Sequence, residues 1–159
     1  MKTLPVSSLV VASFFIAKGV EDARPITNLK AQKLVYIAHG WYLGFYGKPL
    51  IEDEVEAWQY GPVIPRLYRE LQRWNSQPIT FFDVPNRFEE DQDTSESIQK
   101  AKHILEQTWQ KYGCFDAFKL VDLTHRPNTP WFEALFRSRI DNDSIAQHYK
   151  ALKEQGVMG

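Results

Sequence analysis

Histidine and cysteine are the side chains through which this chain could bind a metal or carry out nucleophilic chemistry. Its 159 residues include one cysteine, Cys114, and four histidines, His39, His103, His125 and His148. None of them has a second His, Cys or carboxylate at a spacing typical of zinc sites. The sequence also contains no nucleophile elbow, phosphate-binding loop or dinucleotide-binding fingerprint. It therefore predicts no catalytic residue, no cofactor and no metal site.

Cys114 and His125 each have a catalytic and a structural interpretation. Cys114 follows a glycine that ends a predicted helix, and nothing near it in sequence would activate its thiol. We expect it to be a small buried apolar group. His125 lies at the end of a predicted helix, where an imidazole can bond free carbonyls and its charged form is favoured by the helix dipole. Capping or core bonding is therefore preferred over catalysis for this histidine.

Three arginines, Arg66, Arg69 and Arg73, recur at the spacing of one helical face. A basic stripe of this kind could contact nucleic acid or an acidic partner protein. The formal net charge of the chain is −1 at pH 7, so it has no general basic surface to attract phosphates. We expect a solvated helix face or a protein contact, and nucleic acid as a partner is disfavoured.

Two large aromatic residues, Trp58 and Tyr60, alternate along a short predicted strand from Glu54 to Tyr60. The chain then passes through Gly61-Pro62, and Pro65 opens a predicted helix. Proline fixes φ near its helical value and suits a first helical turn, while glycine takes backbone angles that other residues avoid. The aromatic side chains either hold this strand-to-helix corner in the core or form part of a binding surface.

The remaining elements follow from hydrophobic periodicity and capping residues. With 43% hydrophobic and 25% charged residues, the chain has an ordinary globular composition. We expect an N-terminal core helix within the first twenty residues rather than a signal sequence. Further helices are expected over residues 27–46, 65–74, 93–112, 116–125 and 129–137, and from Asp143 to a glycine end at Gly156. Asp93 with Glu96 resembles a capping box.

A small β-hairpin and one long loop complete the expected fold. The hairpin would pair Leu50-Ile51 with residues 55–60 around the acidic turn Glu52–Glu54. Residues 75–93 should form a solvated loop, anchored by the apolar segment 79–82 and carrying the acidic run 89–91. The fold class is mainly α, a compact helical domain of about six or seven helices with one small β-hairpin. It is expected to be a single domain over residues 1–159.

Several segments, in this order and at these distances, resemble the Panacea domain family. They are residues 26–43, residues 47–50, the corner at residues 56–63, and the Thr124-His125, Pro130-Trp131 and 140–145 segments. The family is known from SocA-like antitoxins of bacterial toxin–antitoxin pairs and from phage-associated proteins of the GepA type. The resemblance runs from about residue 5 to residue 150 and is most specific from Gln32 to Val63. Ala31 departs from the family pattern, which has a larger apolar residue there.

The resemblance implies scaffold roles for the residues that match the family motifs. These residues are Lys33, Tyr36, Gly40, Trp41, Gly61, Pro62, His125, Pro130 and Trp131. The glycines at 40 and 44 each cost about 1 kcal/mol of helix propensity relative to alanine, so we expect another element of the domain to approach closely there.

The resemblance also implies an antitoxin that neutralises a cognate toxin, encoded by an adjacent gene, through direct contact. A protease would be a further partner if the toxin is passed on for degradation, and no membrane contact is implied. Because interfaces favour Trp, Tyr and Arg, the candidate contact residues are Trp58, Tyr60, Arg66, Tyr68 and Arg69. The single cysteine suits the cytoplasm. The alternatives are a DNA-binding autoregulator of its own operon and an enzyme acting on a mobile-element or nucleotide substrate.

Overall fold

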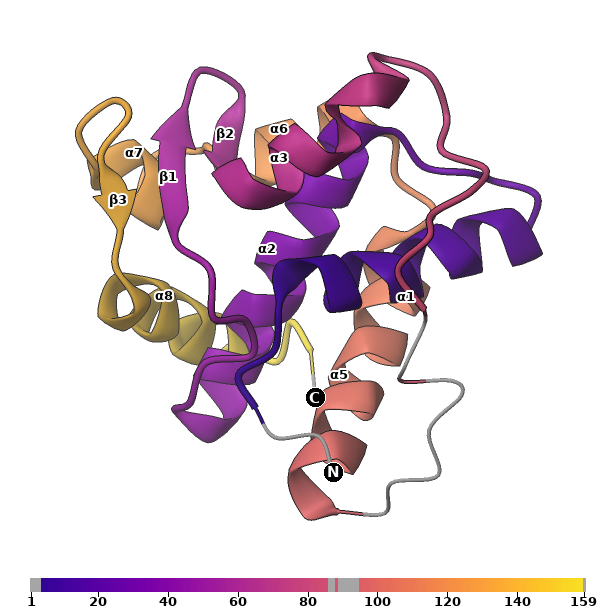
Figure 1. The fold of residues 1–159 in the computed structure, drawn as a ribbon. Helices are drawn as coiled ribbons and strands as arrows, with labels where there is room; N and C mark the ends of the chain where they lie inside the picture. Colours follow the sequence, from indigo (N-terminus) through magenta and orange to yellow (C-terminus); the bar gives the residue numbers. More distant parts are fainter. Residues whose placement is uncertain (1–3, 86–87, 89–94, 159) are drawn as a thin grey trace.

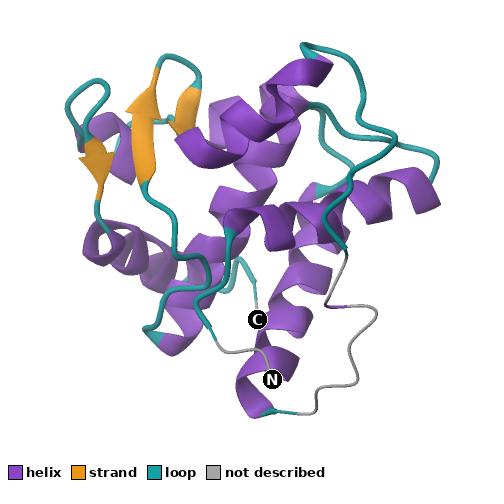
Figure 2. Cartoon of the chain, viewed as in Figure 1, coloured by secondary structure: helices purple, strands orange, loops and turns teal. Residues whose placement is uncertain are grey.

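In the computed structural model, which describes residues 4–85, 88 and 95–158, one long helix runs through the middle of the molecule (Figure 1). The other elements pack around it, with the strands gathered at one side (Figure 2). The predicted mainly α fold class is confirmed. The elements are α1 (Ser8–Glu21), α2 (Asn28–Tyr46), β1 (Val55–Trp58), β2 (Gly61–Val63), α3 (Pro65–Leu71), a 3₁₀ turn (Gln72–Trp74), α5 (Glu96–Tyr112), α6 (Ala117–Thr124), α7 (Pro130–Glu133), β3 (Arg139–Ile140) and α8 (Asn142–Glu154).

Helix α2 forms as the sequence predicts. The Thr27 hydroxyl accepts a hydrogen bond from the Lys30 amide at its start, and Gly47 ends it with φ of 68°. Every residue from Ala31 to Leu43 is buried, so α2 is covered on all sides rather than on one apolar face. Its neighbours include α1, α3, α5, α6, α8 and β2. The polar side chains of α2 therefore need partners inside the protein.

The two glycines inside α2 allow α8 to approach closely, as predicted. A Cβ atom at Gly40 would overlap the Tyr149 ring of α8, and one at Gly44 would lie 2.9 Å from the Tyr149 backbone carbon. Trp41 packs edge-on against the Tyr149 ring, with 5.1 Å between ring centroids. Its indole N–H donates to the Tyr112 hydroxyl of α5 at 3.2 Å. Trp41 therefore joins three helices.

The predicted hairpin is wrong in its strand pairing. β1 pairs with β2 across the two-residue turn Gln59-Tyr60, and β3 adds to the other side of β1. Leu50 and Ile51 instead lie buried beside Val6. Pro62 is tolerated because β2 is an edge strand, where its missing N–H breaks no ladder bond. The acidic residues 52–54 do not form the hairpin turn, and the strand-to-helix corner lies at Ile64-Pro65.

Predictions for the C-terminal third need correction at two helix ends. The helix expected to reach Arg137 ends at Glu133, because the following segment pairs with β1: the Arg137 amide donates to the Ala57 carbonyl at 2.6 Å. Helix α8 is capped by Asp141 instead of Asp143. Asp93 and the acidic run 89–91 lie outside the described residues, and α5 begins at Glu96.

Three further expectations concern the N-terminal helix, the apolar anchor in the loop after α3 and helices that could cross a membrane. The N-terminal core helix is confirmed as α1, which buries Phe14 and Phe15. In the loop, Ile79 is buried but Phe81 is exposed, so the expected apolar anchor is smaller than predicted. No helix among the described residues is long and apolar enough to cross a bilayer.

Replacing Trp41 by alanine tests the packing of α2. We expect Trp41→Ala to lower the free energy of unfolding by about 3–5 kcal/mol, because it leaves a cavity between three helices. Phe81→Ala is the control, since the Phe81 side chain is 63% exposed and its removal should change stability by less than about 0.5 kcal/mol. Urea denaturation measures both values. A Trp41→Ala midpoint equal to that of the wild type would contradict this packing.

Candidate functional site

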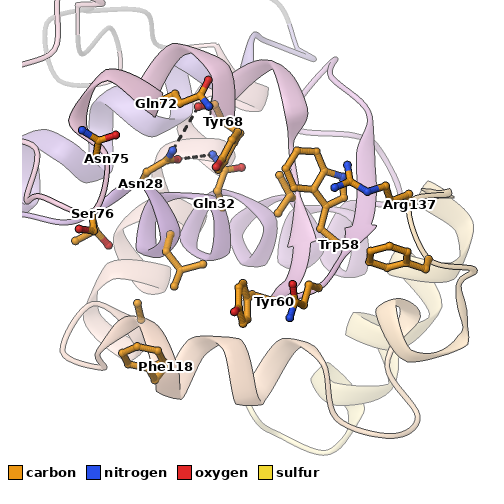
Figure 3. Close-up of a pocket in the computed structure, with 16 residues that line it drawn as sticks. Asn28, Gln32, Trp58, Tyr60, Tyr68, Gln72, Asn75, Ser76, Phe118 and Arg137 are labelled. Atoms are coloured by element: carbon orange, nitrogen blue, oxygen red, sulfur yellow. Dashed lines mark hydrogen bonds between the residues drawn. The ribbon is translucent and has the colours of Figure 1, made fainter.

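A pocket of about 550 Å³ opens beside the β1–β2 hairpin (Figure 3). It lies between the first turns of α2 and α6 and the segment from the middle of α3 through the following 3₁₀ turn. Its volume lies within the range of about 300–1,000 Å³ that is usual for binding pockets. We call it the aromatic pocket. Its aromatic lining residues are Trp58, Tyr60, Tyr68, Phe118 and Phe136. Its polar lining residues are Thr27, Asn28, Gln32, Gln59, Gln72, Asn75 and Ser76, and Arg137 is the one charged residue among the described lining residues.

Trp58 forms one wall of the pocket and is held from several directions. Its ring packs edge-on against Tyr68, with 5.2 Å between centroids, and its indole N–H donates to Glu56 at 2.9 Å. The Trp131 indole N–H donates to the Trp58 carbonyl at 2.6 Å. The Arg137 guanidinium lies 4.9 Å from the Trp58 ring centroid (Figure 3). Trp58 therefore presents a fixed aromatic surface.

Buried amide side chains of α2 form the base of the pocket. The Gln32 amide nitrogen donates to the Asn28 side-chain oxygen at 2.9 Å, and Asn28 donates to the Tyr68 carbonyl at 3.3 Å (Figure 3). The Gln32 oxygen in turn accepts a hydrogen bond from the Ile64 amide at 2.9 Å. These bonds tie α2 to α3 and to Ile64, the residue just before α3.

The mouth of the pocket continues into exposed apolar surface. Tyr60 is 58% exposed and Phe118 is 77% exposed. Phe136 also lines the pocket, and it belongs to an exposed segment that we call the apolar ridge, made of Phe132, Leu135 and Phe136. Leu135 is 80% exposed and Phe136 is 67% exposed. Exposed apolar groups gathered in this way mark interaction surfaces more often than isolated ones do.

The structure separates the five predicted contact residues into two groups. Trp58, Tyr60 and Tyr68 line the aromatic pocket, whereas Arg66 and Arg69 do not. Arg66 binds the carboxylate of Asp53 at 3.1 Å, and the other oxygen of that carboxylate accepts from the Ser8 amide at 2.7 Å. Arg66 thus takes part in the contact between α3 and the start of α1.

The other two arginines of the stripe differ in their surroundings. Arg73 pairs with Asp83 at 3.4 Å. Arg69 is exposed and has no ion pair within the described part of the chain. Only Arg69 therefore presents an uncompensated charge on this face of α3.

Lys33, Gly61 and Pro62 meet at a tightly packed contact next to the pocket. The Lys33 ammonium is fully buried and donates to the Pro62 carbonyl at 2.9 Å. Gly61 has φ of 106°, and a Cβ atom there would lie 3.1 Å from both Lys33 Cε and Thr124 Oγ1. Glycine is therefore required by conformation and by space. Burial lowers the pKa of Lys33 to about 7.

The remaining motif residues lie inside or at the edge of the scaffold. Tyr36 is buried against Tyr149, and its hydroxyl has no hydrogen-bond partner among the described residues. Pro130 is buried at the first position of α7. The His125 ring lies 4.8 Å from the Trp131 ring, and its backbone amide, rather than its imidazole, bonds a carbonyl of α6.

His39 is a buried polar residue whose structural role the sequence did not reveal. Its Nδ1 accepts from the amides of Leu50 and Ile51 at 3.3 and 3.4 Å, so its proton lies on Nε2, which donates to Asn142 at 3.0 Å. Burial lowers the pKa of His39 to about 4 and keeps the ring neutral. The structure shows that His39 lies in the middle of the buried part of α2, where its ring needs hydrogen-bond partners.

Phe118, Phe136 and Arg137 also line the pocket, and the sequence does not reveal them, since nothing in their local pattern separates them from ordinary surface residues. The expectation for Cys114 was wrong, because its side chain is exposed. Within residues 4–85, 88 and 95–158, no three His, Cys, Asp or Glu side chains are grouped closely enough to hold a metal ion.

Lys33 gives the stability of the protein a defined pH dependence. Its pKa is about 7 when folded and has the ordinary value of 10.5 when unfolded. Between these values the unfolded chain binds more protons, so the free energy of unfolding increases with pH by up to about 1.4 kcal/mol per unit. We expect denaturation midpoints from pH 7 to 9 to rise in the wild type relative to Lys33→Met, which lacks the amine. Parallel pH profiles would contradict the burial of Lys33.

Comparison with known proteins agrees with the resemblance found in the sequence. Residues 31–132 match the family model described as "Antitoxin SocA-like, Panacea domain". The chain is 30% identical over 139 residues to Antitoxin SocA of Caulobacter vibrioides (strain NA1000 / CB15N), covering 79% of this chain and 69% of that protein. No solved structure gives a significant match. The chain therefore belongs to the SocA-like antitoxin family that carries the Panacea domain.

Proposed function

We propose that this protein is an antitoxin that neutralises a cognate toxin, encoded by an adjacent gene, through direct contact at the aromatic pocket and the apolar ridge. Membership of the SocA-like antitoxin family supports the antitoxin role. The observation that carries the choice of surface is the exposure of Phe118 and Phe136 at a pocket whose Trp58 wall is fixed.

The physical arrangement suits protein binding better than catalysis. Binding energy in protein interfaces is concentrated in a few Trp, Tyr and Arg side chains surrounded by apolar contacts that exclude water. Trp58 and Tyr68 are already held by the fold, so little side-chain freedom is lost when a partner covers them. The role that we propose for this chain is accordingly non-enzymatic.

We further propose that the contact takes place in the cytoplasm, where the toxin is synthesised. Binding then either holds the toxin in an inactive complex or delivers it to a protease. The lifetime of the toxin in cells distinguishes these outcomes, because sequestration prolongs it and delivery shortens it.

Exposed residues at the pocket mouth provide the sharpest test of this surface. We expect Tyr60→Ser and Phe118→Ser to remain folded and to weaken binding of the adjacent gene product by about tenfold or more, the scale of truncating a strong interface residue. Phe81→Ser is the matched control, because it removes an equally exposed aromatic ring outside the aromatic pocket. Co-purification and growth rescue measure binding, and circular dichroism reports folding.

The outcomes of this experiment separate several possibilities. No capture of the adjacent gene product by the wild type would contradict the proposed function. Capture that is unaffected by both pocket variants but lost in Arg69→Glu would move the interface to the outer face of α3. Arg69 is the better probe of that face, because Arg66→Glu would place a second carboxylate against Asp53 and disturb the start of α1.

The DNA-binding alternative makes a separate prediction. We expect the purified protein to bind its own upstream DNA no better than random DNA at near-physiological salt. Its net charge is −1, and Arg66 and Arg73 of the three-arginine stripe are bound to carboxylates, which leaves little positive surface for phosphates. An electrophoretic mobility shift specific to the upstream region would favour the autoregulator instead.

A further inference from the structure

Arg137 differs from most other arginines of the protein because aromatic rings, rather than a carboxylate, lie next to its guanidinium. Arginines 24, 66, 73, 126 and 139 each pair with a carboxylate. Arg137 is exposed, and no carboxylate within the described part of the chain forms an ion pair with it. Its guanidinium lies over aromatic rings, 4.9 Å from the Trp58 centroid and 5.6 Å from that of Phe136.

The position of Arg137 is fixed by its backbone as well as by the contact of its guanidinium with Trp58. Arg137 has φ of 64°, in the left-handed region, and its amide donates to the Ala57 carbonyl of β1 at 2.6 Å. A guanidinium that lies over an aromatic ring keeps its N–H donors at its periphery, where they can bind a carboxylate through two parallel hydrogen bonds. Arg137 is therefore a held cation with unused donors at the pocket wall.

The rest of the pocket lining carries no charge among the described residues. Its surfaces are aromatic rings and neutral amides, and the amides of Asn28 and Gln32 are already bonded within the protein. Glu56, which lies on β1 with Trp58, uses its carboxylate to accept the Trp58 indole N–H at 2.9 Å. A ligand that fits these surfaces has a large apolar group and, beside it, an anionic group for Arg137.

We propose that the pocket receives a short segment of the partner protein in which an aromatic or large aliphatic side chain adjoins a carboxylate. The apolar side chain enters between Trp58, Tyr60 and Phe118, and the carboxylate binds the Arg137 guanidinium. This assignment rests on the proposed function for the identity of the partner as a toxin.

The exposed apolar ridge favours a protein segment over a free small molecule. A small ligand is largely enclosed by its pocket and would leave Phe132 and Leu135 facing water. A protein that inserts one segment into the pocket also covers the ridge beside it, and burial of that apolar area adds to binding. The charge of Arg137 and the exposure of the ridge thus point to the same kind of occupant.

A pair of probes that differ only in charge tests the chemistry without a partner protein. N-acetyltryptophan has an indole and a carboxylate, and N-acetyltryptophanamide replaces the carboxylate by a neutral amide. In NMR titrations we expect both to shift the Trp58 indole N–H signal. The carboxylate probe should bind about three- to tenfold more tightly, the effect of one charge-assisted contact at an accessible site.

Two arginine variants assign this preference. Arg137→Gln should abolish the difference between the probes, and Arg69→Gln, which removes an exposed arginine outside the pocket that has no ion pair within the described residues, should keep it. Equal affinities in the wild type, a preference that survives Arg137→Gln, or signal changes confined to other surfaces would overturn the proposal.

Co-purification of the adjacent gene product then distinguishes a protein segment from a small molecule. We expect Arg137→Gln and Leu135→Ser both to reduce capture, by about threefold or more. If the probe preference holds but neither variant reduces capture, the pocket binds a small carboxylate and the assignment to a protein segment is overturned. If the wild type captures nothing while the probe preference holds, the proposed antitoxin function fails and the carboxylate chemistry remains supported.

Discussion

The structure depends on the burial of residues 31–43 of α2, because polar side chains on a helix covered on all sides are costly unless they find partners inside the protein. Gln32, Lys33 and His39 meet this requirement in the same way, by bonding the main chain of the segment between residues 50 and 64. They bind the Ile64 amide, the Pro62 carbonyl and the amides at residues 50 and 51, respectively. The path of this segment, which includes β1 and β2, is thus fixed by bonds to a single helix. The short β1–β2 hairpin, which would be marginal alone, is stabilised by the third strand and by packing against α2.

The aromatic pocket is a consequence of that arrangement. Because Pro62 of β2 and Ile64 just after it are fixed to α2, the β1–β2 hairpin holds Trp58 at the pocket with the amide side chains of its base. The approach of α8, made possible by Gly40 and Gly44, extends the same constraint to the C-terminal third of the chain, where β3 pairs with β1 just before α8 begins. The segment that carries Phe136 and Arg137 is therefore positioned by both the sheet and the central helix.

The sequence predicts those features whose causes are local. The start of α2 at Thr27, its end at Gly47, and the close approach at its glycines all follow from caps, propensity and spacing. It does not predict β3, because two residues have no periodicity and form a strand only where the edge of β1 is available. The same pairing overrides the helical pattern after Pro130 and turns Arg137 toward Trp58. Pocket residues that come together through tertiary contacts were missed for this reason. Trp58, Tyr60 and Tyr68, predicted as contact residues from their type beside a recognisable corner, line the pocket, and their contact role stays a prediction.

Scaffold and proposed contact residues occupy different places in this protein, and that separation has a physical consequence. Lys33, Tyr36 and Trp41 are buried, and Gly61 has no room for a side chain, so substitutions at these positions would disturb the packing of the core. The rim residues, such as Phe118 and Leu135, are exposed and can change with small effects on folding. Phe136 and Arg137 lie beyond the residues that match the family model, which end at residue 132. A scaffold of this design can therefore present different rim side chains, and hence suit different partners, while the helix and hairpin that position them stay the same.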